Sequence, residues 1–382
     1  MQLFNVYPLF DIEPVRGQGS YVFDKEGTSY LDFYGGHAVI SIGHSHPHFV
    51  QAIQQQTERL VFYSNSVQNG LQQRLAHKLG QLSGCEDYQL FLCNSGAEAN
   101  ENALKLASFH TGRTKIIAFQ KAFHGRTSAA VNITDNPKIQ APINKTFEVE
   151  YHPFNDLESV RQSLEKGDVC ALIVEGIQGV GGIHVPDPSF LEAVAELCQK
   201  HGSLLILDEI QSGYGRSGKF FAFQYADIQP DLITVAKGMG NGFPIAGVLI
   251  HPNIKASYGL LGTTFGGNHL ASAAGLAVLE VIEQEQLMAA AAQKGTYLMK
   301  QLQQLPDVES IRGHGLMIGL SFPYPVKSLR KQLLFEQKVF SGSSSDPHVL
   351  RLLPPLTITQ EEADHFVQAL HQTIEKAASL TH

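Results

Sequence analysis

The sequence has little that is typical of membrane, secreted or nucleic-acid-binding proteins. No apolar stretch in its 382 residues approaches the length needed to cross a bilayer. The first residues also lack the charged and apolar regions of a signal peptide. Lysine and arginine (28 together) are outnumbered by aspartate and glutamate (36), and no basic block offsets the net charge of −8, so nothing indicates a nucleic-acid partner. The four cysteines form no C-x-x-C pair and no disulfide-like framework. These absences predict a soluble protein of a reducing compartment, the cytoplasm, with no metal site built on cysteine.

The residues that are present predict a large α/β fold. Hydrophobic residues make up 43% of the chain, which is enough for a large core and two domains. Apolar runs at 89–93, 171–174, 203–207 and 232–236 have the length and composition of buried strands. Helical patterns begin between them, so we expect a mostly parallel sheet covered by helices on both faces.

The pattern changes toward both ends of the chain. We expect residues 1–60 to form an N-terminal arm, 61–285 a large domain, and 286–382 a smaller α+β domain that packs with the arm. Within the last segment, strands are predicted near 308–322 and at 349–353, and the serine-rich stretch 341–345 is predicted to be a surface loop.

Lys237 stands between a predicted buried strand and a glycine-rich stretch. It follows the apolar run 232–236, and Asp208 follows the run 203–207 in the same way, so both residues emerge at carboxyl ends of strands. Ligands bind at this edge of open α/β sheets. A lysine and an aspartate placed there are costly unless they serve a bound partner. Pyridoxal phosphate needs both, a lysine for its aldehyde and an acid for its pyridinium nitrogen. On this segment alone, the alternative to a cofactor-binding role is that Lys237 is the first residue of an ordinary loop.

A phosphate site is predicted where a strand meets a helix. Ser95, Gly96 and Ala97 follow the run 89–93 and open a helix, where backbone N–H groups and the helix dipole favour a phosphate. The alternative is an ordinary turn whose serine caps the helix.

Three further residues fit a flat ring and carboxylates. Phe123 stands close to a glycine and can stack on a flat cofactor. Arg126, three residues on, can bind a carboxylate through two hydrogen bonds, although a surface arginine in a turn is the alternative. Arg351 stands inside the apolar run 349–353, where a charged residue is hard to place without an anion.

Two other motifs are misleading. The segment 213–218 matches G-x-G-x-x-G, but no clear helix follows it, and a dinucleotide site needs strand, glycines and helix in immediate succession. His44, His46 and His48 look like a metal cluster. No cysteine or carboxylate accompanies them in the sequence, however, so we expect a turn.

Five motifs, spread over nearly the whole chain, occur in the order found in one family. They are Asn94-Ser-Gly-Ala-Glu-Ala-Asn100, Phe123-His-Gly-Arg-Thr127, Asp208-Glu-Ile-Gln211, Ala236-Lys-Gly238 and Thr264-Phe-Gly-Gly-Asn268. Together they resemble the class III (subgroup II) aminotransferases. The segments 34–47 and 350–355 are most similar to the acetylornithine and ornithine aminotransferase branch. The resemblance implies a fold-type I pyridoxal-phosphate enzyme, active as a homodimer with shared sites.

The same resemblance implies roles around the cofactor ring. Lys237 would bind the cofactor's aldehyde, and Asp208 would pair with its ring nitrogen. Gln211 would hydrogen-bond the ring hydroxyl, and Phe123 would stack on the ring.

Around the phosphate and the substrates, it implies that Ser95, Gly96 and Ala97 hold the phosphate, with Thr264 reaching it from the neighbouring subunit. Arg126 would bind the distal carboxylate of the substrate. Arg351 would bind the carboxylate of 2-oxoglutarate next to the keto group.

One segment departs from the family's pattern. The branch has Glu-Pro-x-Gln-Gly-Glu-Gly-Gly where this chain has Glu175-Gly-Ile-Gln-Gly-Val-Gly-Gly182, so Val180 stands in place of a glutamate. That glutamate is thought to mask the second arginine while an ω-amine donor is bound. How Arg351 is screened here, by Glu175, Glu209 or another group, is left open.

The implied reaction moves the δ-amino group of N-acetylornithine, or another N-acylornithine, to 2-oxoglutarate, giving the semialdehyde and glutamate in arginine biosynthesis. N-succinylornithine is a further donor to consider. Ornithine δ-aminotransferase, or transfer from another ω-amine, is the nearest alternative. From other classes, a dinucleotide-dependent oxidoreductase built on 213–218 and a non-catalytic ligand-binding relative stay open. The presence of both Lys237 and Asp208 disfavours the last.

Overall fold

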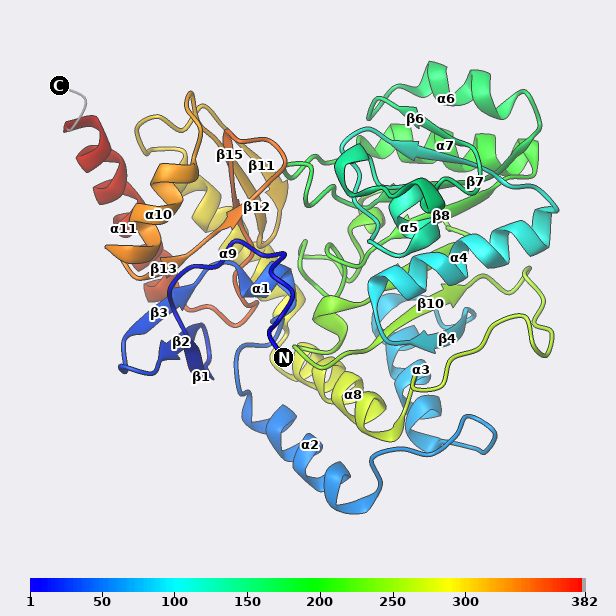
Figure 1. Cartoon of the computed structure of the whole chain (residues 1–382), viewed down its shortest axis with the longest axis horizontal. Coiled ribbons are helices and arrows are strands. Elements are labelled where there is room, and N and C mark those ends of the chain that lie inside the picture. Colours follow the sequence, from blue (N-terminus) through cyan, green and yellow to red (C-terminus); the bar gives the residue numbers. More distant parts are fainter. Residues whose placement is uncertain (380–382) are drawn as a thin grey trace.

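Most strands predicted from the apolar runs pair in a single sheet in the computed structural model, which describes residues 1–379 (Figure 1). The seven strands lie in the order β4-β10-β9-β8-β7-β5-β6. They are β4 (Gln89–Cys93), β5 (Lys115–Phe119), β6 (Val149–His152), β7 (Val169–Glu175), β8 (Leu204–Asp208), β9 (Leu232–Val235) and β10 (Ala246–Ile250). Only β10 runs antiparallel to its neighbours β4 and β9, so the prediction of a mostly parallel sheet is confirmed.

Helices cover both faces of this sheet because its strands are apolar on both faces. Every residue of β7, β8 and β9 is buried. Alternate residues of one strand join different hydrophobic clusters: Leu205 and Leu207 lie in one, and Leu204 and Ile206 in the other. The helices of this lobe are α3 (Gly70–Ser83), α4 (Gly96–Thr111), α5 (Ser128–Asn132), α6 (Leu157–Leu164), α7 (Pro188–His201) and α8 (His269–Gln284). Side chains of α4 complete the second cluster, and those of α3, α7 and α8 belong to the first.

Two helices have side-chain hydrogen bonds that cap their first turns. The Ser95 hydroxyl accepts a hydrogen bond from the Glu98 amide at 3.2 Å, which fixes the first turn of α4. At α11 (Gln360–Ser379) the exchange is reciprocal: the Thr359 hydroxyl accepts from the Glu362 amide at 3.1 Å, and the Glu362 carboxylate accepts from the Thr359 amide at 2.8 Å.

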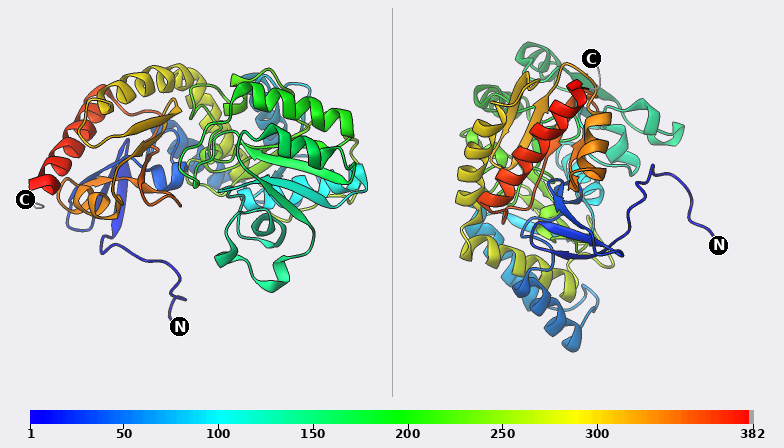
Figure 2. Two further views of the ribbon diagram at one scale, coloured as in Figure 1. Left: turned by 90° about the horizontal axis from the view of Figure 1, so that it is seen from above. Right: turned by 90° about the vertical axis from the view of Figure 1, so that its left-hand side faces the viewer.

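The two ends of the chain build a second lobe. Its sheets have the orders β1-β2-β3-β13 and β11-β12-β15-β14. The strands are β1 (Pro14–Gln18), β2 (Tyr21–Asp24), β3 (Ser29–Asp32), β11 (Ser310–His314), β12 (Met317–Ser321), β13 (Val339–Phe340), β14 (Gly342–Ser343) and β15 (Val349–Leu352). Its helices besides α11 are α9 (Leu287–Leu302) and α10 (Lys327–Phe335). Because β3 pairs with β13, the N-terminal segment packs with the C-terminal one, as expected. Residues before β1 form an extended arm (Figure 2).

The division at residues 60 and 285 stays a prediction. Helix α2 (Pro47–Arg59) falls in the first predicted segment but packs against α8 of the second. The prediction of a surface loop at 341–345 is wrong. Gly342 and Ser343 form β14, which pairs with β15 opposite Arg351 and Leu350, and Ser341 is buried. A two-residue strand is too short to give the periodic pattern on which strand prediction rests.

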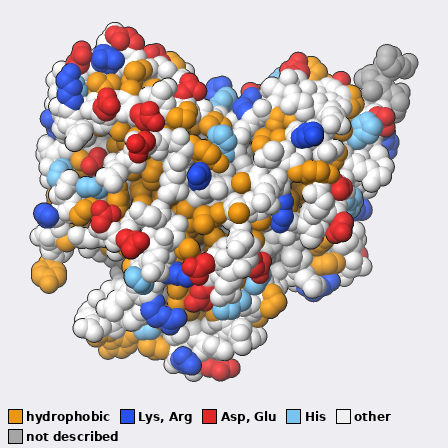
Figure 3. Space-filling view, turned by 180° about the vertical axis from the view of Figure 1, so that it is seen from behind, with side chains coloured by type: hydrophobic (Ala, Val, Ile, Leu, Met, Phe, Trp, Pro, Cys, Tyr) orange, Lys and Arg blue, Asp and Glu red, His pale blue; other side chains and the backbone are white. Residues whose placement is uncertain are grey.

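Neither misleading motif has the structure that its sequence pattern suggests, and the turn expected at the histidines is limited to the residues before α2, because His48 lies in that helix. Residues 213–218 are followed by further turns and a short 3-10 helix (Ala222–Tyr225), with no long helix behind the glycines. His44, His46 and His48 each contact a different carboxylate, and the described residues hold no group of metal-ligating side chains. No helix in the described part of the chain is long and apolar enough to span a bilayer. On the face in Figure 3, acidic and basic side chains are interspersed with apolar ones, and a notch separates the lobes.

Candidate active site

Five strands of the large sheet end at one cavity. The carboxyl ends of β4, β5, β7, β8 and β9 lie at the same edge, because these strands run in the same direction. The cavity has a volume of about 300 Å³. Of the residues predicted for cofactor binding, all but Thr264 line it: Ser95, Gly96, Ala97, Phe123, Asp208, Gln211 and Lys237. The residues predicted for cofactor binding therefore lie, Thr264 excepted, at the carboxyl edge where ligands of open α/β sheets bind.

Lys237 stands at the cavity in an uncommon backbone conformation. It begins a short 3-10 helix (Lys237–Met239) with φ of 48°, a region that non-glycine residues seldom adopt. Burial lowers the pKa of its amine to about 8, although Asp208 and Glu175 nearby favour the charged form. At this pKa about a tenth of the lysine is a neutral amine at pH 7, far more than at the ordinary lysine pKa, and the neutral amine is the form that a nucleophile or base requires.

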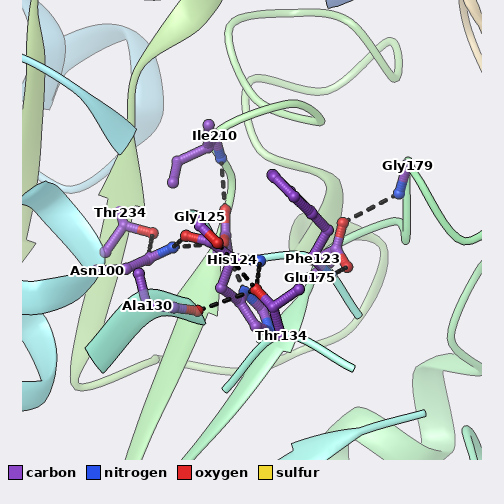
Figure 4. Close-up of polar contacts among 11 residues, drawn as sticks. Asn100, Phe123, His124, Gly125, Ala130, Thr134, Glu175, Gly179, Ile210 and Thr234 are labelled. Atoms are coloured by element: carbon purple, nitrogen blue, oxygen red, sulfur yellow. Dashed lines mark hydrogen bonds and ion pairs between the residues drawn. The ribbon is translucent and has the colours of Figure 1, made fainter. Parts of the chain in front are cut away.

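Asp208 is held by a buried hydrogen-bond network, whose members Asn100, His124, Ile210 and Thr234 are labelled in Figure 4. One of its oxygens accepts from the Ile210 amide at 3.1 Å. The other accepts from Asn100 Nδ2 at 2.8 Å and contacts His124 Nδ1 at 2.7 Å. Asn100 is itself fixed by the hydroxyl of Thr234 at 2.8 Å. The network orients a carboxylate that is only 4% exposed at the wall of the cavity.

Sequence reasoning assigned no role to His124, Asn100 and Thr234. Two of them lie inside recognised motifs, so their positions were visible, but their partners are more than 80 residues away in the chain. The signal in the sequence was that these polar residues lie in or near the motifs, at positions where no solvent-exposed face was predicted for them.

Glu175 is a second buried acid at this edge. Its carboxylate accepts from the Phe123 amide at 3.1 Å and from the Gly179 amide at 3.0 Å, so it ties the Phe123 turn to the glycine segment after β7 (Figure 4). Burial raises its pKa to about 7, with a smaller opposing effect from His124. Glu209 has a similar shift, to about 7 through burial. It accepts from the amides of Ala222 and Phe223 and serves the fold rather than the cavity.

The opposite end of the cavity suits a phosphate. Gly96 and Ala97 lie in the first turn of α4, whose N–H groups have no partners within the helix. The Gly96 position is tight, because a Cβ there would come within 2.8 Å of the Ile210 side chain. A side chain at this position would therefore press against Ile210, which also lines the cavity.

Arg351 is buried beside Gln211, away from solvent. The Arg351 Nη1 donates to the Gln211 side-chain oxygen at 3.3 Å, and Gln211 Nε2 donates to the His37 carbonyl at 3.2 Å. Gln211 thus links the cavity wall to the buried arginine.

Arg126 and Thr264 were predicted as site residues, but neither lines the cavity. Both are exposed in this chain. The loop of Thr264 is held by its neighbour Thr263, whose hydroxyl accepts from Asn94 Nδ2 at 3.3 Å. Their predicted roles are not tested by the geometry of one chain.

The arrangement has the features that pyridoxal phosphate requires. A partly neutral lysine, a fixed buried carboxylate, an aromatic ring and a helix N-terminus surround one cavity, and they match the cofactor's aldehyde, ring nitrogen, ring face and phosphate. The buried Asp208 is the strongest sign, because the partners of its oxygens among the described residues are two amide groups and the His124 ring, and a cationic ring nitrogen would complete its environment.

Comparison with known proteins defines the class. The sequence pattern of the family "Aminotransferase class-III" matches residues 5–374. The chain belongs to this family and is a pyridoxal-phosphate-dependent transaminase with an α/β fold of type I.

The chain is also similar to individual proteins of known name. The chain is 42% identical to the acetylornithine aminotransferase of Bacillus subtilis over 380 residues, covering 97% of each chain. The ornithine aminotransferase of Toxoplasma gondii has a TM-score of 0.92 at 28% identity, covering 99% of this chain and 93% of that one. The acetylornithine aminotransferase of Elizabethkingia anophelis has a TM-score of 0.84 at 33% identity, covering 98% and 96%.

Proposed function

We propose that this protein transfers the δ-amino group of N-acetylornithine, or another N-acylornithine, to 2-oxoglutarate, as a step of arginine biosynthesis. The observation that carries the proposal is a buried strand-end lysine facing a fixed buried carboxylate in a chain 42% identical to an acetylornithine aminotransferase. The products are the semialdehyde of the donor and glutamate.

In this proposal the cavity residues hold the cofactor. The Lys237 amine binds its aldehyde, the Asp208 carboxylate pairs with its ring nitrogen, and Phe123 packs on its ring. The amides of Gly96 and Ala97, with the Ser95 hydroxyl, receive the phosphate at the start of α4. Gln211 donates to or accepts from the ring hydroxyl, for which it must exchange one of its present partners.

The bound cofactor supplies an electron sink for the bond that breaks at the amine-bearing carbon. The protein's part is proton movement and orientation. Once the amine of the donor has displaced it from the aldehyde, Lys237 Nζ would take the proton from the δ-carbon of the donor as a neutral amine and pass it to the cofactor. In the second half-reaction it would take a proton back from the cofactor and deliver it to the keto carbon of the acceptor. Asn100 and His124 keep Asp208 in place throughout, since their hydrogen bonds fix one of its oxygens.

Two arginines are proposed for the carboxylates of the substrates. Arg126 binds the carboxylate of the donor that is remote from the reacting amine, and Arg351 binds the carboxylate of 2-oxoglutarate beside its keto group. Charge-assisted pairs of this kind are among the stronger polar contacts in proteins.

We further propose a cytoplasmic homodimer with shared active sites. The exposed position of Thr264 supports a contact with the phosphate site of a partner subunit, because within one chain this residue lies outside the cavity. The four cysteines are free and buried, as expected in a reducing compartment.

A panel of amine donors tests the proposal. Glutamate formation from 2-oxoglutarate should be most efficient with an N-acylornithine, and weaker with ornithine, lysine or 4-aminobutyrate. The similarity to the Toxoplasma gondii ornithine aminotransferase favours ornithine as the second candidate, so a higher kcat/KM for ornithine than for N-acetyl- and N-succinylornithine would overturn the proposed donor.

A further inference from the structure

The buried Arg351 is held by neutral groups. Its side chain is 3% exposed, and its Nε donates to the Ser343 carbonyl at 2.5 Å. Nη1 donates to the Gln211 amide oxygen, and the guanidinium carbon lies 5.9 Å from the centre of the Tyr34 ring. Among the described residues, no carboxylate lies within ion-pair distance of this arginine. A guanidinium fixed in this way keeps its charge available for an anion.

Tyr34 is packed tightly against the strand that faces Arg351. A Cβ at Gly342 would come within 2.5 Å of Tyr34 Cε2 and 3.2 Å of Arg351 Cβ. Only glycine at 342 therefore leaves room for the ring beside the arginine. Tyr34 also packs against a cluster that contains Ile177, Met317 and Leu353.

The hydroxyl of Tyr34 is tied to His37 through a short hydrogen bond to Nδ1. His37 lies in a left-handed turn: Gly35, Gly36, His37 and Ala38 have φ between 53° and 70°. For the two non-glycine residues this conformation is unfavourable. The turn places the His37 carbonyl where Gln211 donates to it.

These contacts connect four residues around the arginine. The Tyr34 hydroxyl binds the His37 ring, and the His37 carbonyl accepts from the Gln211 side chain. The Gln211 oxygen accepts from Arg351, whose guanidinium lies over the Tyr34 ring. Strained turns of this kind persist only where the surrounding structure determines them, and they cluster at functional sites.

We propose that Tyr34 and His37 are positioning residues for Arg351, which hold its guanidinium in place for the carboxylate of the amino-group acceptor without neutralising it. The inference rests on the proposed role of Arg351 in binding 2-oxoglutarate. It goes beyond that role because it assigns the orientation of the arginine to an aromatic face and a left-handed turn.

The neutrality of both residues follows from their surroundings. Burial raises the pKa of the Tyr34 phenol, an effect that the nearby Arg351 only partly opposes. Burial and then Arg351 lower the pKa of His37. A phenolate or an imidazolium would respectively mask the guanidinium or repel it, so the neutral forms are the ones that leave Arg351 ready for an anion.

Half-reaction kinetics of the holoenzyme test the proposal with three variants. Tyr34→Leu removes the ring, Tyr34→Phe keeps the ring and removes the hydroxyl, and His37→Gly removes the imidazole while tolerating the left-handed backbone. For Tyr34→Leu we expect KM for 2-oxoglutarate to rise about tenfold, since a desolvated cation–π contact has that magnitude. KM for the N-acylornithine donor and kcat of its half-reaction should stay close to those of the parent. His37→Gly and Tyr34→Phe should raise KM for 2-oxoglutarate by smaller factors.

Tyr30→Phe is the matched control. Tyr30 is a buried tyrosine of the same lobe whose hydroxyl donates to Asp24 at 2.9 Å, away from the cavity. Its loss should leave both values of KM unchanged.

Calorimetric binding of glutarate, a dicarboxylate with no reacting group, gives a readout independent of turnover. The affinity for glutarate should fall in Tyr34→Leu, in step with the rise in KM for 2-oxoglutarate. It should be retained in Tyr30→Phe. An unchanged glutarate affinity in all three variants would overturn the inference. An equal loss of catalytic efficiency in both half-reactions would overturn it as well. If Tyr34→Leu does not fold, Tyr34→Phe and His37→Gly decide it in the same way. A parent enzyme that binds glutarate but forms no glutamate from any N-acylornithine would contradict the proposed function and leave the positioning role measurable.

Discussion

At the scale of single residues, the chemistry centres on an amine that the fold makes less basic. Burial lowers the pKa of Lys237 to about 8, and the neutral form is the nucleophile. The folded-state pKa lies below the ordinary lysine value, so the reactive fraction grows as pH rises and saturates above the folded pKa. We predict that the rate of covalent cofactor attachment to the apoprotein increases by about tenfold per pH unit below pH 8 and levels off above it. Stopped-flow absorbance across pH 6.5–9.5 (an assay range, about one and a half units on either side) measures it. A rate that keeps rising about tenfold per pH unit up to pH 9.5, as an ordinary lysine would give, would contradict the lowered pKa.

A second prediction identifies the same lysine chemically. Lys237→Ala should abolish turnover while the protein keeps its fold, because the side chain lies at the cavity and makes no hydrogen bond among the described residues. Borohydride reduction of the parent holoenzyme followed by peptide mapping should place the cofactor on Lys237. Labelling at any other lysine refutes the assignment.

Val180 gives a third prediction at this scale. It lines the cavity where the family has a glutamate, and its carbonyl accepts from the Ser345 amide at 2.8 Å, so its backbone is fixed. Val180→Glu should place a carboxylate within reach of Arg351 and raise KM for 2-oxoglutarate by about tenfold, or ~1.4 kcal/mol, while the ω-amine half-reaction is spared. Val180→Gln, of the same size without the charge, is the control. An equal effect of both substitutions would show that bulk rather than charge is responsible.

At the scale of elements, strand ends were predictable and their long-range partners were not. Lys237 and Asp208 were predicted because apolar runs, strand ends and ligand edges follow one another by general rules. Glu175 ends a strand in the same way, yet its significance lies in the Phe123 and Gly179 amides that it holds, and no local pattern contains that pairing. The turn at 35–38 was equally invisible, since two of its four residues are not glycine and left-handed backbone is not expected there.

The glycine segment after β7 supports a prediction about an element. A Cβ at Gly179 would lie 1.7 Å from the Gln211 side-chain oxygen, so Gly179→Ala must displace Gln211 and with it one hydrogen bond to Arg351. We expect KM for 2-oxoglutarate to rise by about three- to tenfold, since a charged hydrogen bond is worth ~1 kcal/mol or more. Gly70→Ala is the control, because a Cβ at Gly70 meets no atom within 4 Å at the first position of α3. Kinetics indistinguishable from those of Gly70→Ala would contradict the packing argument.

At the scale of the whole molecule, apolar side chains are exposed on two segments near the cavity strands. Phe62 is 38% exposed and Phe265 is 60% exposed, and the centres of their rings lie 5.4 Å apart. The N-terminal arm adds Leu3 and Phe4, both at least 90% exposed. Exposed apolar patches mark interaction surfaces, and the Phe62–Phe265 pair adjoins Thr264. A second copy of the chain is the partner that the proposed shared site requires.

The last prediction tests whether that second copy completes the site. Light scattering should give twice the chain mass of 41.8 kDa. If Thr264 contacts the partner's phosphate site, Lys237→Ala and Thr264→Glu impair the same site of a mixed dimer, and the other site keeps both native residues. Two inactive variants, unfolded and refolded together, should then recover about a quarter of the parent activity, because half of randomly paired dimers are mixed and each has one intact site. If Thr264 acts only within its own chain, a mixed dimer has no intact site and no activity returns. An active monomer would contradict the shared site outright.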